Sequence, residues 1–201
     1  MNILLETGLP EEIDGLPIYA DFRNMIRFEL ILQDEELSPQ EKTIFGLSQL
    51  FETIPTDIEY AIEKLLWFYM CGRDTQGGGE SRKHAERAYD FEKDSSCIYS
   101  AFYAAYGISL TTLSFLHWWE FMALLESLPE TTQMAQLMRY RTMDLSKIKD
   151  KTTRTHYANI KKRVALETPK IFASKSVEEI TRLNKERVAK RFETAKKAVQ
   201  N

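Results

Sequence analysis

The sequence predicts a mainly α-helical fold: a compact multi-helix domain with a small N-terminal β-hairpin and an extended C-terminal helix. Apolar residues recur at helical spacing along much of the chain, and helix-start signals precede several of these stretches. A two-residue hairpin signal, Asp14-Gly15, lies near the start. Because 43% of the 201 residues are hydrophobic and 11% are aromatic, the chain can form a sizeable core.

The hairpin is expected within "EEIDGLPIYA", residues 11–20. Asp14 and Gly15 both tolerate the positive φ that a two-residue turn requires, and short stretches with apolar residues flank them. Pro17 has no backbone N–H, so the second strand is restricted to an edge.

The first helices begin at readable capping signals. Asp21 can cap "FRNMIRFELIL", where Phe22, Met25, Ile26, Glu29 and Leu32 recur at helical spacing. "SPQE" (38–41) is a capping box with proline at the first helical position. "TDIE" (56–59) repeats the box before a helix that Gly72 can end.

A second group of helices is expected after a polar segment with three consecutive glycines (74–83), which we interpret as a flexible loop. A phosphate-binding loop would need a preceding strand and a following helix that usually carries Lys-Ser/Thr, and neither is present in that form. The expected helical stretches are 94–107, 108–129, 131–143 and the increasingly basic 144–166.

The stretch "LHWWEFMALLESLP" (116–129) holds two tryptophans, a histidine and a glutamate. On a helical wheel its apolar residues cover almost the whole circumference, which predicts a central, buried helix. Trp118 and Trp119 point about 100° apart and should contact different neighbours. His117 and Glu120 would share one helical face, but a metal site needs further ligands. A hydrogen-bonded histidine in or near the core is favoured.

No fingerprint of a known catalytic or cofactor-binding site occurs in the sequence, so we expect no catalytic residues, cofactor or metal. The two cysteines, Cys71 and Cys97, are expected to be buried free thiols, and the apolar run around Cys71 should raise its pKa. The carboxylates of "LPEEIDG" and "QDEEL" leave acid–base chemistry open as an alternative, although acidic loops are usually just solvated.

The charge is distributed unevenly. Residues 1–100 carry 20 acidic and 9 basic residues, whereas residues 101–201 carry 10 acidic and 18 basic ones. The basic half can meet an acidic protein surface, another copy of the chain or nucleic acid. Because acidic residues are interleaved and no nucleic-acid-binding motif occurs, nucleic acid is the less favoured partner.

The last segment predicts a partner-binding helix. Residues 167–175 read as a linker, and a capping box at Ser176 opens a helix that runs to the C-terminus. One narrow apolar stripe lines an otherwise charged circumference, so this helix should dock on a neighbour. We therefore expect a domain at 1–166 and a linker with a basic helix at 167–201. The candidate partner-binding residues are Val177, Ile180, Val188, Arg191, Phe192, Ala195 and Val199.

The N-terminus lacks the basic region and the long apolar run of a signal peptide. The longest strictly apolar run, 65–71, is too short to cross a membrane, which needs about 20 residues. We expect a soluble, intracellular protein.

Several stretches resemble the bacteriophage gene-product-fifteen family. They are "YADFRNMIRFELILQD", "TDIEYAIEKLLWFYMCG", "AYDFEKDSSCIYSAFYAAYGISL", "LHWWEFMALLESLP" and "LMRYRTMDLSKIKDK". The resemblance runs in order over about residues 1–166, and the residues that follow fit the pattern less well. It implies a long-tailed phage or prophage of Gram-positive bacteria, with a gene in the tail module close to the tape-measure gene.

That placement implies a non-enzymatic role in virion assembly, as a tail-assembly chaperone or accessory factor acting with the tape-measure protein. The alternative is a structural component that stays in the tail or baseplate of the particle. Both roles would be performed through protein–protein contacts, and self-association is a further expectation.

Overall fold

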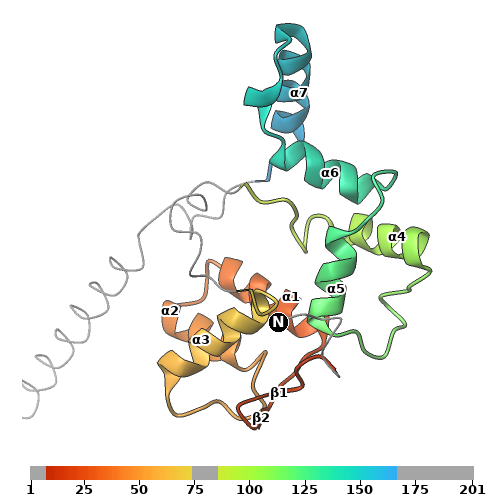
Figure 1. Ribbon diagram of the computed structural model, residues 1–201. Helices are drawn as coiled ribbons and strands as arrows, with labels where there is room; N and C mark the ends of the chain where they lie inside the picture. The colour runs from red at the N-terminus through yellow and green to blue at the C-terminus, as the bar shows by residue number, and fades with distance from the viewer. Residues whose placement is uncertain (1–7, 74–85, 167–201) are drawn as a thin grey trace, which may run out of the picture. The chain divides into compact units, whose positions relative to one another are not determined.

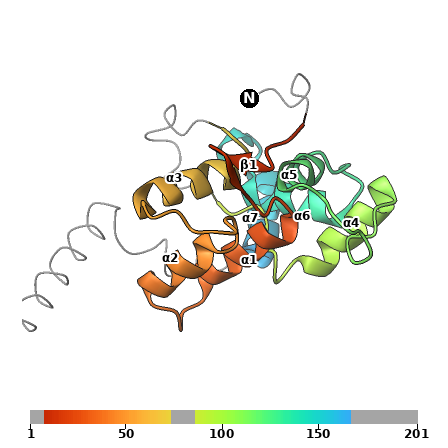
Figure 2. The same cartoon turned by 90° about the horizontal axis from the view of Figure 1, so that it is seen from below.

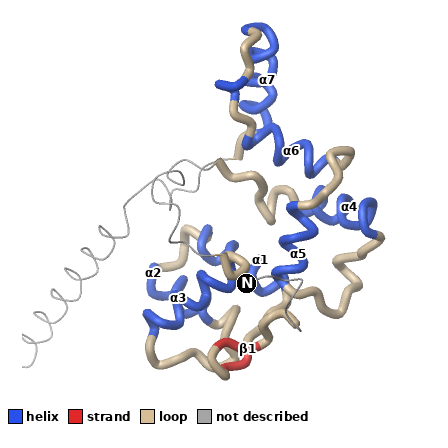
Figure 3. The backbone as a smooth tube through the Cα atoms, in the orientation of Figure 1, coloured by secondary structure: helices blue, strands red, loops and turns tan. Residues whose placement is uncertain are grey.

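A computed structural model describes residues 8–73 and 86–166. The chain divides into two units, Met1–Leu166 and Glu167–Asn201, and all described residues belong to the first. This part of the chain is mainly α-helical with one small N-terminal hairpin, as the sequence predicted (Figures 1 and 3). The expected loop at 74–83 and the expected C-terminal helix lie outside the described residues. The elements are β1 (Glu12–Ile13), β2 (Leu16–Pro17), α1 (Phe22–Gln33), α2 (Pro39–Leu47), α3 (Ile58–Tyr69), α4 (Ser95–Tyr106), α5 (Trp118–Glu126), α6 (Gln133–Thr142), the 3-10 helix η2 (Leu145–Lys147) and α7 (Lys151–Val164).

The hairpin forms at the predicted turn. β1 pairs with β2 in antiparallel register, with Ile13 opposite Leu16. Asp14 and Gly15 between them have φ values of 49° and 79°, so both positions use the conformation that favours these residue types. The Asp14 carboxylate also accepts a hydrogen bond from the Tyr60 hydroxyl and lies 3.5 Å from the Lys64 ammonium. These contacts fix the hairpin turn to α3.

Two of the three predicted helix starts are confirmed, and the third is shifted by one residue. Asp21 caps α1, and Ser38 forms the complete capping box with Glu41 at the start of α2. The expected box at 56–59 is wrong, because Asp57 is the cap of α3 and accepts from the Tyr60 amide at 3.0 Å. An aspartate at this position is a better cap than the threonine before it.

α3 ends at Tyr69 with Met70 as its C-cap, and the predicted Gly72 closes this helix end under a steric constraint. Its φ is 66°, and its amide donates to the Trp67 carbonyl at 3.0 Å. A Cβ at this position would lie 2.9 Å from the Cη2 atom of Trp119. Glycine is therefore required both for the left-handed conformation and for the close approach of the indole ring. Gly107 ends α4 with a similar φ of 68°, but nothing lies within 4 Å of its Cβ position.

The helix expected over 108–129 is shorter than predicted. α5 begins at Trp118, and residues 108–117 form turns and extended chain. The reason is tertiary: Leu116 and Trp118 hydrogen-bond to the segment that precedes α1, with Phe22 N to Leu116 O at 2.9 Å and Trp118 N to Ala20 O at 2.8 Å. Phe115, which falls within the expected stretch 108–129, lies outside α5 and is 49% exposed. α5 is consequently a central helix with one exposed side, rather than apolar all round.

The two tryptophans of α5 connect it to the end of α3. The indole N–H of Trp118 donates to the Tyr69 carbonyl at 2.9 Å, and that of Trp119 donates to the Phe68 carbonyl at 2.8 Å. The last carbonyls of a helix lack partners within it, and the Trp118 indole supplies a donor to that of Tyr69. The Phe68 carbonyl also accepts from the Cys71 amide at 3.0 Å, so the Trp119 indole is a second donor to it. Their rings face different neighbours, as predicted: Trp118 stacks on Tyr69, and Trp119 packs edge-on against Trp67.

The helix expected over 144–166 is interrupted. Asp144 caps the short η2, residues 148–150 are extended, and Asp150 caps α7 by accepting from the Thr153 amide at 2.6 Å. Each aspartate offers its carboxylate to a new helix start, and this divides the stretch into two elements. No residue of α7 is buried.

α5 occupies the centre of the described unit. It packs against α1 on one side and α4 on the other, while α2 packs on α1 and α3 packs on α2 (Figures 1 and 2). α6 packs on α4, and α7 packs on α6 at the end of the unit away from α2 and α3 (Figure 1). Among the helices of residues 8–73 and 86–166, none is long and apolar enough to cross a membrane.

Candidate functional site

The most strongly charged exposed element of the described unit is the hairpin of α6 and α7. We call residues 139–166 the basic hairpin, because they carry nine lysines and arginines and two aspartates. α7 alone has five basic residues and no acidic one. A helix of this composition presents a positive potential to solvent and attracts acidic partners.

One side of α7 carries cations that have no counter-ion in the described part of the chain. Lys151, Arg154 and Lys162 are exposed and lie within about 80° of one another around the helix axis at 100° per residue. None of the three forms an ion pair with another residue of 8–73 or 86–166. We call these three residues the basic face.

The side of α7 that adjoins the basic face at Arg154 contacts α6 and the loop before η2, because Lys161 lies about 20° and Tyr157 about 60° from Arg154 around the helix axis. The Tyr157 ring lies 6.2 Å from that of Tyr140, and the Lys161 ammonium donates to the Met143 carbonyl at 2.7 Å. Lys161 also pairs with Glu86 at 2.5 Å. α7 is thus held by polar and aromatic contacts on one side, and Lys151 and Lys162 of the basic face lie about 80° or more around the axis from the contacting residues.

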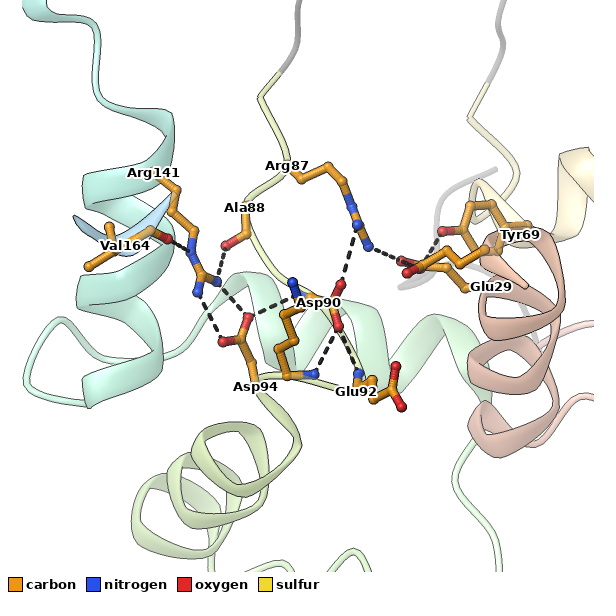
Figure 4. A network of polar contacts seen from close by, with 11 residues as sticks. Glu29, Tyr69, Arg87, Ala88, Asp90, Glu92, Asp94, Arg141 and Val164 are labelled. Atoms are coloured by element: carbon orange, nitrogen blue, oxygen red, sulfur yellow. Dashed lines mark hydrogen bonds and ion pairs between the residues drawn. The ribbon is translucent and has the colours of Figure 1, made fainter. Parts of the chain in front are cut away.

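A buried ion pair anchors this hairpin to the rest of the unit (Figure 4). Arg141 of α6 contacts both carboxylate oxygens of Asp94, with N–O distances of 2.5 and 3.0 Å. The same guanidinium donates to the Val164 carbonyl at 2.7 Å and to the Ala88 carbonyl at 3.2 Å. One side chain therefore joins the end of α7, the segment before α4 and the start of α4.

A second cluster lies beside the first and reaches α1 and α3 (Figure 4). Arg87 lies between Glu29, at 3.0 Å, and Asp90, at 3.3 Å. Glu29 also accepts from the Tyr69 hydroxyl at 2.8 Å. Burial raises the pKa of the Glu29 carboxyl and, together with the nearby carboxylate, that of the Tyr69 phenol.

These buried charges are structural, because each is already engaged. Asp90 accepts from the amides of Glu92 and Lys93, and Asp94 accepts from the amide of Asp90. Among the described residues, no buried side-chain nitrogen or oxygen lacks a hydrogen-bond partner. The network thus positions the basic hairpin and leaves no free group aimed at a ligand.

Sequence reasoning did not find this network. The pairs Asp94–Arg141 and Glu29–Arg87 join residues 47 and 58 positions apart, and no local pattern links them. One signal was present: Glu29 occupies a position in the apolar spacing of α1, where a carboxylate needs a partner.

His117 is the hydrogen-bonded histidine near the core that the sequence favoured. It is 3% exposed, and its Nδ1 atom accepts from the Trp119 amide at 3.0 Å as the cap of α5. Its Nε2 atom lies 3.2 Å from the Pro10 carbonyl. Because His117 precedes the helix, it does not share a helical face with Glu120, contrary to the prediction. Burial lowers its pKa below the usual value.

The cysteines are free, and both are half-buried rather than buried as predicted. Burial raises the pKa of the Cys71 thiol to about 11, in the predicted direction. In the acidic loops Glu11, Glu12, Glu35 and Glu36 are exposed, whereas Asp14 is held by Tyr60 and Lys64. Within residues 8–73 and 86–166, no group of three or more possible metal ligands comes together.

An open groove of about 490 Å³ lies between α4 and the turn that leads into α6. Its lining contains no ionisable side chain. It consists of the small or neutral residues Ser100, Ala101, Ala104, Ala105, Pro129, Thr131, Thr132 and Gln133. The described groups with the clearest burial-raised pKa values, such as Tyr69 and Tyr89, lie elsewhere, in the packed interior. The predicted partner-binding residues from Val177 to Val199 fall outside the described residues.

Comparison with known proteins identifies one matching family. The family model described as "Bacteriophage Gp15 protein" matches residues 8–166 of the 201-residue chain. No curated protein and no solved structure matches the chain. The matched range ends at the last residue of the basic hairpin.

Proposed function

Because the chain belongs to the bacteriophage Gp15 protein family, we propose that it is a non-enzymatic phage tail-assembly protein. In this proposal it acts in the host bacterial cytoplasm as a tail-assembly chaperone or accessory factor with the tape-measure protein. The family match over residues 8–166 is the observation that carries the proposal. It spans both described segments, and therefore includes the basic face.

The chemistry of the described unit supports action through protein contacts. The buried ionisable groups of the described residues are all hydrogen-bonded within the protein. The groove along α4 has no acid, base or thiol in its lining. The exposed features are charged or apolar surfaces, such as the basic face and the exposed Tyr99 and Tyr103 of α4. Surfaces of this kind suit the recognition of another protein.

A chaperone role follows from what a tape-measure protein requires. A long helical polymer with apolar stripes must be shielded until the tail tube closes around it. A protein that binds such stripes reversibly can provide this shielding, and it leaves when the tube subunits take its place.

Co-expression tests the partnership. The tagged chain should retain the tape-measure product from the same phage on an affinity column, and a tagged version of an unrelated phage protein of similar charge should not. If the tape-measure product stays insoluble and unbound in the presence of the full chain, the proposed chaperone role is wrong.

The second candidate is a structural component retained in the tail or baseplate. Quantitative mass spectrometry of purified particles separates the two roles. The chaperone proposal predicts that the chain is absent from mature particles, whereas a structural component would appear in a fixed copy number. A fixed copy number would therefore replace the first proposal by the second.

A further inference from the structure

Two oppositely charged surfaces lie at opposite ends of the described unit. The basic face on α7 is one of them. The other belongs to the segment that contains α2 and α3, where residues 34–64 carry eight acidic and two basic side chains. Figure 1 shows α7 at one end of the unit and the α2–α3 pair at the other.

The acidic surface also has an apolar component. Ile58, Ile62 and Leu66 follow one another at four-residue spacing along α3, so they form a row on one side of the helix. Ile58 is 42% exposed and Leu66 is 45% exposed, while Ile62 is half-buried. A continuous row of exposed apolar side chains marks a surface that another molecule covers.

Two carboxylates border this row. Glu59 and Glu63 lie four residues apart, next to the row around the helix axis, and both are exposed. Neither forms an ion pair with another residue of 8–73 or 86–166. We call the three apolar residues together with Glu59 and Glu63 the acidic face.

The basic face has the complementary chemistry. Lysine and arginine side chains place their aliphatic stems on apolar surface and keep their charged ends in contact with acceptors or water. Lys151, Arg154 and Lys162 can therefore cover the row of Ile58, Ile62 and Leu66 while their charges meet the bordering carboxylates. Lys151 and Lys162 are separated by 11 residues, or about 16 Å along the helix, and Ile58 and Leu66 by about 12 Å.

We propose that the basic face of one copy docks on the acidic face of a second copy, so that the protein associates head to tail. The two faces of one copy lie at opposite ends of the unit, and they can meet each other between different molecules. Such a contact is heterologous, and repetition of it gives a closed ring or an open filament. This inference is independent of the proposed contact with the tape-measure protein.

Sedimentation velocity of the full chain tests the proposal. The average mass should rise with protein concentration at about 50 mM NaCl and return to that of the monomer at about 500 mM, because salt screens exposed charges. A chain that remains monomeric at every concentration at low salt would overturn the proposal.

Charge reversal identifies the two faces. The double variants Arg154→Glu/Lys162→Glu and Glu59→Lys/Glu63→Lys should each weaken self-association by about tenfold or more. Lys147→Glu/Lys149→Glu is the matched control: it changes the net charge by the same amount as the α7 variant at exposed positions outside the basic face, and it should associate like the original chain. Equal weakening by the control would show a non-specific charge effect and contradict the proposal.

Mixing the variants gives the sharpest test. The α7 variant keeps its acidic face and the α3 variant keeps its basic face, so an equimolar mixture should form a dimer and stop there. A mixture that stays monomeric contradicts the head-to-tail arrangement. If the original chain stays monomeric and the α7 variant instead loses retention of a DNA duplex, the basic face serves nucleic acid and the proposal fails.

Discussion

Asp94, at the start of α4, and Arg141, in the last turn of α6, form a two-point ion pair in the interior. Both side chains are less than one-tenth exposed. The pair lies where the basic hairpin joins the rest of the unit, so it determines how α7 and its basic face are presented.

Removal of Arg141 should therefore be costly. Arg141→Met leaves the Asp94 carboxylate buried without its cation, which should lower the free energy of unfolding by about 3–5 kcal/mol. Urea titration followed by tryptophan fluorescence measures this loss. Arg139→Met on the same helix is the control: Arg139 is 61% exposed and pairs with an exposed glutamate, so its removal should cost less than about 1 kcal/mol. Similar losses for both variants would contradict the buried-anchor interpretation.

Removal of either tryptophan of α5 should destabilise the fold about as much as removal of Arg141. Trp118→Ala and Trp119→Ala each remove a buried ring and leave a carbonyl at the end of α3 without its indole donor, so each should cost about 3–5 kcal/mol. Thermal melting monitored by circular dichroism measures the effect. Trp67→Ala, at a half-buried position, should cost less. Unchanged melting of the Trp118 and Trp119 variants would refute the placement of α5 at the centre.

Gly72 and Gly107 provide a matched pair for the close approach of Trp119. Both have positive φ, so alanine at either position should cost about 1–2 kcal/mol for the left-handed conformation. Gly72→Ala additionally brings a methyl group to 2.9 Å from the Trp119 ring, so it should be the more destabilising of the two. Urea midpoints of the two variants decide this, and an equal or larger loss for Gly107→Ala would show that the ring yields without cost.

Because His117 is buried, the folded chain should lose stability in mild acid. Burial places its pKa in the folded chain below the usual value of 6.5, so below about pH 6.5 the unfolded chain binds a proton that the folded chain does not. Stability from this group is complete above pH 6.5 and falls as the pH decreases toward the folded pKa, by at most about 1.4 kcal/mol per pH unit.

His117→Asn isolates this contribution, because asparagine can still accept the Trp119 amide as a helix cap. The difference in unfolding free energy between the two proteins should change with pH below 6.5 and be constant above it. A difference that is the same at every pH would contradict the burial of a neutral imidazole.

The Cys71 thiol should react slowly. Its pKa of about 11 leaves about one thiol in a thousand ionised at pH 8, roughly a hundredfold less than for an ordinary cysteine. In a Cys97→Ser background, modification by a disulfide reagent should be slow in the folded chain and fast in urea. Rapid modification without denaturant would show that the end of α3 opens readily.

The features that sequence reasoning found are those fixed by neighbouring residues. The turn at Asp14-Gly15 and the box at Ser38 each depend on fewer than about six consecutive residues, so the pattern contains the whole cause. The start of α3 was missed by one residue, because Thr56 and Asp57 are both capable caps and the pattern alone does not choose between them.

The features that it missed have tertiary causes. α5 starts at Trp118 because residues 116–118 pair with the chain before α1, almost 100 positions earlier. The basic hairpin is anchored by the ion pair of Asp94 and Arg141. The residues around either one do not predict which distant residue will be its partner. The basic character of 144–166 was recognised from composition, whereas the direction of its free face required the contacts of Arg141 and Lys161.

Electron microscopy of particles from a phage that lacks this gene is the most direct test of a role in tail assembly. Such a role predicts filled or empty heads without normal tails, and tailed particles when the full chain is supplied from a plasmid. Normal tails in the absence of the protein would contradict a role in tail assembly.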